Sequence, residues 1–185
     1  MIFLSAGHHL KDPGAVSNGI QENLLTIELR DMIVRQLQKK EKKQDIDFKI
    51  DDDKETLSQY LSRIKTGSGS VVFEVHFDAS SSNKATGTTM LIPSRQWTKE
   101  YILEERFGKE VSTIVSTILG IKNRGCIDET QSHRGKLGLM REEGINGLLE
   151  VCFITNPDDL KNYNLHKQTL ADKLAEVLIK YDLLK

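Results

Sequence analysis

The chain has 185 residues, of which 38% are hydrophobic and 29% charged, and its formal net charge is -1. This composition predicts a single globular domain, 1–185, with its own core, since neither internal repeats nor a linker divide the sequence. The balanced charge argues against nucleic-acid binding, and no apolar run is long enough for membrane insertion.

The N-terminus and the cysteines bear on where the chain folds. Residues 1–5 lack the charged start, long apolar stretch and cleavage site of a secretory signal, so we expect synthesis in the cytoplasm. Cys126 and Cys152 have no CxxC spacing, and they predict neither a thiolate zinc site nor, in a reducing compartment, a disulfide.

Strand-like and helix-like segments alternate along the first half of the chain, which is typical of an α/β fold. The expected elements are a strand at 1–5, a glycine-rich loop at 7–19, a helix at 21–38, a strand at 47–50, and a helix carrying Leu57, Tyr60, Leu61 and Ile64.

The second half continues the alternation. Strands are expected at 71–77 and 87–93, followed by a helix at 98–119 capped by Gly120. An irregular stretch at 121–136 and strands at 137–141 and 147–154 come next. Asn156 and Pro157 open a further helix, and a last helix carries Leu170, Leu174, Val177, Leu178 and Tyr181. We therefore expect a central twisted, mostly parallel but mixed sheet of about six strands, with helices on both faces.

Ionisable residues stand where strands end or where a strand should be apolar. His8 and His9 follow the first strand, and His76 lies near the end of 71–77. The carboxyl ends of parallel strands line the ligand crevice, so these imidazoles can meet in space. Glu150 lies inside the apolar run 147–154, where a carboxylate costs several kcal/mol unless it is paired, and this makes it a site candidate.

Glu22 opens the first helix, directly after the glycine-rich loop that begins near His8. If the loop folds back, His8, Glu22 and His76 supply two imidazoles and one carboxylate, the ligand set of many hydrolytic zinc sites. Plainer interpretations stay open at this point. A glutamate in a first helical turn commonly compensates the helix dipole, and a histidine at a strand end is commonly an ordinary polar residue.

The order of motifs resembles that of the zinc-dependent N-acetylmuramoyl-L-alanine amidases of the Amidase_3 type. The resemblance covers nearly the whole chain. It rests on "GHHLKDPGA", "GIQEN", "FEVHFDAS", "ATGTTMLI", "GLMR" and "LLEVCFITNPDDL", in this order. The stretch around His133 and Arg134 matches no motif of the family.

The resemblance implies a role for each matching residue. His8, Glu22 and His76 would bind one Zn²⁺, and Glu150 would be the general base and acid. The substrate would be peptidoglycan, cleaved at the amide between the lactyl group of N-acetylmuramic acid and L-alanine. His9 stands where the family usually has glycine, so it is not expected to be a ligand.

Two further residues have weaker support as contacts for the substrate. Arg141, in "GLMR", could assist the oxyanion or bind a carboxylate of the stem peptide. Asp78 stands where family members often carry asparagine, and it adds a negative charge beside the site.

Other functions remain open on the sequence alone. A related zinc carboxypeptidase or aminopeptidase would use the same ligands on another bond, and a non-catalytic wall-binding module would need none of them. A nucleotide-binding domain is disfavoured because "GSGS" at 67–70 lacks the following Lys-Ser/Thr of a phosphate loop. A catalytic domain with neither an export signal nor a separate wall-binding domain suggests a phage or prophage endolysin, released to act on the cell wall. The oligomeric state is not predicted.

Overall fold

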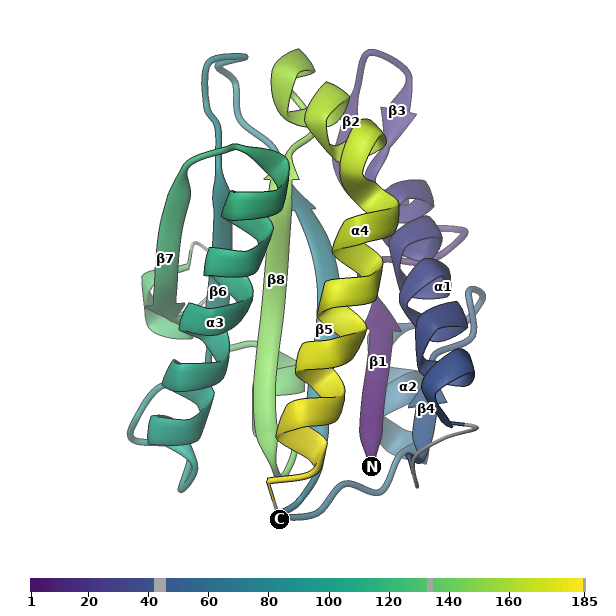
Figure 1. Ribbon diagram of the computed structural model, residues 1–185, viewed down its shortest axis with the longest axis vertical. Helices are drawn as coiled ribbons and strands as arrows, with labels where there is room; N and C mark the ends of the chain where they lie inside the picture. The colour runs from purple at the N-terminus through teal and green to yellow at the C-terminus, as the bar shows by residue number, and fades with distance from the viewer. Residues whose placement is uncertain (42–45, 133–134, 185) are drawn as a thin grey trace.

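A six-stranded mixed sheet forms the centre of the computed structural model, which describes residues 1–41, 46–132 and 135–184 (Figure 1). In their order across the sheet, the strands are β4 (Phe48–Ile50), β1 (Ile2–Ala6), β5 (Val71–Asp78), β8 (Ile145–Phe153), β6 (Thr88–Ile92) and β7 (Asn123–Asp128). β6 is antiparallel to β8, whereas all other neighbours are parallel. The predicted mostly parallel, mixed sheet is confirmed.

Helices cover the two faces of the sheet unequally (Figure 1). One face carries the long helices α1 (Glu22–Glu41), α3 (Tyr101–Leu119) and α4 (Pro157–Asp182). The opposite face carries the short helix α2 (Leu57–Arg63) and the 3₁₀ turn η2 (Gly138–Arg141), which contact each other. We call this second face the α2 face.

The side chains of β5 point alternately to the two faces of the sheet. Val71, Phe73, Val75 and Phe77 belong to the large core beneath the long helices. Val72 points the other way and packs against α2 and η2, together with Phe3, Tyr60, Ile64 and Leu139. Because side chains alternate along a strand, Glu74 and His76 also lie on the α2 face. This alternation places the ionisable residues of β5 away from the main core.

The caps of the long helices follow the sequence signals. Gly120 ends α3 in the left-handed conformation, with φ of 63°, and its N–H bonds to the Ser116 carbonyl. The Asn156 side chain accepts hydrogen bonds from the backbone N–H groups of Asp158 and Asp159, and Pro157 is the first residue of α4. None of the helices in the described part of the chain combines the length and apolar character that a membrane span needs.

Several predicted elements are wrong in detail. Residues 123–128, expected to be irregular, form the edge strand β7, and 137–141, expected to be a strand, contains η2. The two helices expected after Asn156 are the single helix α4. The loop at 7–19 contributes to a small antiparallel hairpin of β2 (Val16–Ser17) and β3 (Ile20–Gln21). His133 and Arg134 lie outside the described residues.

Candidate metal centre

The carboxyl end of β1 carries His8 to the edge of β5. The Gly7 N–H donates to the Val75 carbonyl at 2.7 Å, which extends the pairing of the two strands by one residue. A Cβ atom at Gly7 would lie 2.4 Å from the His76 ring, so only glycine permits this approach. His8 itself has φ of 68°, a conformation that costs energy in a residue with a side chain.

Glu22 is the buried centre of the cluster. As the first residue of α1, it directs its carboxylate back toward the loop. Oε2 accepts a hydrogen bond from the Ala15 N–H at 2.9 Å, and Oε1 accepts one from the Phe77 N–H at 3.1 Å. His8 Nε2 lies 3.1 Å from Oε2, and His76 Nδ1 lies 2.9 Å from Oε1. The glycine-rich loop thus does fold back, and it brings the three predicted ligands together.

The geometry of these three side chains fits a single metal ion. One ligand atom from each of His8, Glu22 and His76 lies within 4.8 Å of the other two. Nitrogen and oxygen ligands about 2.1 Å from a tetrahedral zinc ion would lie about 3.4 Å apart. The separations of 2.9 and 3.1 Å from the imidazoles to Glu22 are a few tenths of an ångström shorter. His8 Nε2 is buried, and although it lies 3.1 Å from Glu22 Oε2 it makes no well-aligned hydrogen bond among the described residues. The cluster can therefore hold a metal ion.

A second carboxylate faces the other nitrogen of each imidazole. Asp12 Oδ2 lies 2.9 Å from His8 Nδ1, and Glu74 Oε2 lies 3.4 Å from His76 Nε2. Metal-binding histidines typically donate their second N–H to such a group, which fixes the tautomer and the ring orientation. Sequence reasoning did not assign either residue. The signal for Glu74 was present, because it is a charged residue inside the apolar run 71–77.

The local electrostatics favour positive charge. Burial alone would lower the pKa of His76, but hydrogen bonds with Glu22 and Glu74 and the charge of Glu150 raise this pKa well above its ordinary value. Burial likewise opposes a rise in the pKa of His8, but Glu22 and Asp12 outweigh it. For Glu22, the two imidazoles overcome burial and hold the pKa well below its ordinary value. The cluster therefore stabilises a cation.

Glu150 lies beside the cluster on the neighbouring strand. β8 pairs in parallel with β5 so that Glu150 is opposite His76, and on the other side it is opposite Thr89 of β6. Residues opposite each other in a sheet project from the same face, which places Glu150 next to His76 on the α2 face. Every other residue of β8 is buried, whereas Glu150 is half-buried. The predicted acid is thus adjacent to a predicted ligand and partly open to solvent.

The remaining candidates, Asp78, His9 and Arg141, each have local partners of their own. Asp78 ends β5, two residues after His76, and its carboxylate accepts a hydrogen bond from the Ala79 N–H. His9 Nδ1 accepts a bond from the Lys11 N–H within the loop. Arg141 lies in η2, where its guanidinium pairs with the fully buried Glu129 and stacks 4.5 Å from the centre of the Trp97 ring.

Comparison with known proteins places the chain in a family. Residues 2–180 match the family model described as N-acetylmuramoyl-L-alanine amidase. The chain belongs to the N-acetylmuramoyl-L-alanine amidase family. The predicted family and enzyme class are confirmed by this match, which covers the strands and the loop that carry His8, Glu22, His76 and Glu150. No curated protein matches the chain.

Solved structures share the fold of this amidase domain at low sequence identity. An N-acetylmuramoyl-L-alanine amidase from Clostridium difficile is 20% identical with a TM-score of 0.73, over 98% of this chain and 94% of that one. An endolysin catalytic domain targeting Clostridium difficile is 17% identical with a TM-score of 0.71, over 97% and 96%. An amidase from Nostoc punctiforme is 15% identical with a TM-score of 0.76, over 98% and 96%.

Proposed function

We propose that this amidase is a zinc-dependent hydrolase that cleaves the amide between the lactyl group of N-acetylmuramic acid and L-alanine in peptidoglycan. The observation that carries the proposal is the convergence of His8, Glu22 and His76 within 4.8 Å, with Glu150 opposite His76 in the sheet. Two imidazoles and one carboxylate leave a fourth tetrahedral position open for water.

Each residue has a defined task in the proposed reaction. His8, Glu22 and His76 would hold one Zn²⁺, which when bound lowers the pKa of a coordinated water to about 7 and polarises a carbonyl group. Glu150 would take a proton from the attacking water and then deliver it to the departing amine of L-alanine. Its half-buried position on an otherwise buried strand supports this task.

Asp78 and Arg141 are proposed to contact the substrate. Asp78 ends β5 two residues after His76, which places it close to the proposed metal ligands. One terminal nitrogen of Arg141 is engaged by Glu129, but the side chain is still 36% exposed. A guanidinium has five N–H donors, so Arg141 retains donors for a carboxylate of the stem peptide.

The proposed setting is the cell wall. We propose that residues 1–185 act as a single catalytic domain, as a lytic enzyme of the endolysin kind, and the fold shared with an endolysin catalytic domain supports this. A wall-binding module without catalysis would have no use for an acid beside a metal-binding cluster.

Product analysis of digested peptidoglycan tests the proposal. Purified walls are incubated with the protein with zinc and with a chelator, and new termini are identified by mass spectrometry. We expect new L-alanine amines and new lactyl carboxyls on muramic acid, and neither should form when the chelator is present. New termini only within the stem peptide would instead indicate a peptidase, and chelator-resistant cleavage would contradict the metal.

A further inference from the structure

Glu74 is a buried carboxylate that the proposed reaction does not use. It lies in the middle of β5, directly opposite Ser5 of β1, and only 4% of its surface is exposed. A carboxylate in such a position costs several kcal/mol unless nearby groups compensate it. A residue of this kind in the sheet therefore requires a physical reason.

Glu74 has two side-chain partners. The Ser5 hydroxyl donates to Oε1 at 3.4 Å, and His76 Nε2 lies 3.4 Å from Oε2. Within the described residues, no lysine or arginine pairs with Glu74. The nearby cations are engaged elsewhere, since Arg30 pairs with Asp51 and Arg63 with Glu55. The imidazole of His76 is thus its charge partner.

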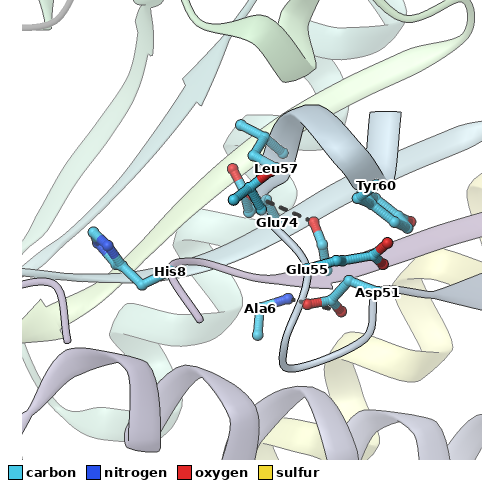
Figure 2. Close-up of a pocket in the computed structure, with 9 residues that line it drawn as sticks. Ala6, His8, Asp51, Glu55, Leu57, Tyr60 and Glu74 are labelled. Carbon is cyan, nitrogen blue, oxygen red and sulfur yellow. Dashed lines mark hydrogen bonds between the residues drawn. The ribbon is translucent and has the colours of Figure 1, made fainter. Parts of the chain in front are cut away.

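The Glu74 carboxylate lies beside a small cavity on the α2 face. It lines a small cavity of about 20 Å³ together with Asp51, Glu55 and Tyr60, and the ring of His8 points away from these side chains (Figure 2). A cavity of this size admits about one water molecule. The Ser5 hydroxyl donates to Oε1 from the side of β1, and Oε2 faces His76.

His76 is therefore held between two carboxylates that serve different purposes. Its Nδ1 faces Glu22, inside the proposed metal cluster, and its Nε2 faces Glu74, outside it. An imidazole can give a lone pair to a metal from one nitrogen only if the other nitrogen carries the proton. A carboxylate at Nε2 stabilises that tautomer and makes Nδ1 a better donor.

We propose that Glu74 is a positioning residue for His76. Glu74 accepts the hydrogen bond from Nε2–H, fixes the plane of the ring, and keeps the lone pair of Nδ1 available to the metal ion, while Ser5 holds the carboxylate in place. This inference rests on the proposed zinc site of His8, Glu22 and His76. Asp12 faces His8 in the same way but is largely exposed, so Glu74 is the stronger constraint.

Zinc affinity measured against a competing chromogenic chelator tests this role. Glu74→Met removes the acceptor with little change in volume, and we expect it to weaken zinc binding 10- to 100-fold. Glu74→Gln keeps an acceptor oxygen without the charge, so we expect a smaller loss. The matched control is Glu104→Gln, the same change at another fully buried glutamate beside the other end of β8, which should bind zinc as the wild type does.

A spectroscopic readout separates positioning from loss of folding. In the zinc-loaded wild type we expect a downfield, exchange-protected proton on Nε2 of His76, shifted upfield in Glu74→Gln. Wild-type zinc affinity in Glu74→Met, or an unchanged His76 proton in Glu74→Gln when Glu74→Met does not fold, would overturn the inference. A wild type that binds no zinc would instead overturn the proposed function on which the inference rests.

Discussion

At the scale of single residues, the cluster depends on which atom each side chain presents. His8 offers Nε2 and His76 offers Nδ1 to the same carboxylate, and the opposite nitrogens face Asp12 and Glu74. The two rings meet edge to face, with centroids 5.1 Å apart. His8 makes these contacts from a left-handed backbone, with φ of 68°.

Because Glu150 is not one of the three proposed ligands, a substitution there should remove activity without removing zinc. Glu150→Gln should lower kcat on peptidoglycan about 10²- to 10⁴-fold, since the amide cannot take a proton from water. Zinc content should stay near one ion per chain because all three ligands remain. Activity is measured by release of dyed wall fragments and zinc by elemental analysis. A variant that loses its zinc would identify Glu150 as a ligand instead.

The site could be predicted from the sequence in part, for reasons visible at particular residues. His8, His76 and Glu150 stand out because strands rarely carry ionisable groups, and the convergence of His8 and His76 follows from neighbouring strand ends. To predict that Asp12 and Glu74 contact the histidines, one must know the path of the loop and the register of β1 on β5. Neither can be read from spacing.

At the scale of elements, amphipathic periodicity and buried apolar runs were sufficient for α1, α3, β5 and β8. β7 was missed because it is an edge strand with exposed residues such as Asn123 and Arg124, so it lacks an apolar signature. η2 was taken for a strand because Leu139 and Met140 are fully buried, and a short apolar run does not distinguish a strand from a turn packed on a sheet.

The packing of α3 on β8 predicts a pH effect on stability. Glu104 of α3 is fully buried and accepts a hydrogen bond from the Asn146 N–H at 3.2 Å. Burial raises the pKa of Glu104 from 4.5 to about 7. The folded state therefore keeps a proton that the unfolded chain has released, and the unfolding free energy contributed by this group falls as the pH rises from 4.5 to 7.

Glu104→Gln isolates that contribution. The amide has the shape of the protonated acid, so the variant should gain roughly 3 kcal/mol relative to the wild type between pH 4.5 and pH 8. Urea unfolding at several pH values measures the difference between the two proteins, in which other titrating groups cancel. A constant difference across this range would show that Glu104 is ionised in the folded state.

At the scale of the whole molecule, the cluster joins segments that are far apart in the chain. His8 follows β1, Glu22 opens α1, and His76 lies near the end of β5. An ion held by all three would bind the folded state and not the unfolded chain. Zinc at about 100 times its Kd should therefore add about 2.7 kcal/mol of stability, which corresponds to a Tm increase of roughly 5–10 °C in a domain of this size.

Differential scanning calorimetry with and without zinc checks this stabilisation. A chelator should reverse the Tm increase, and His76→Ala should abolish both the increase and the activity. A zinc-loaded, active His76→Ala protein would contradict the assignment of the ligands. An equal Tm increase in His76→Ala would show that zinc binds elsewhere on the molecule.

The place of β8 in the sheet has a consequence for folding during synthesis. β8 lies between β5 and β6, although it is the last strand to be synthesised. Until residues 145–153 insert, the two halves of the sheet have no shared neighbour, and Glu150 is not yet opposite His76. The same strand therefore completes both the sheet and the proposed site, and a chain that stops before residue 145 would lack both.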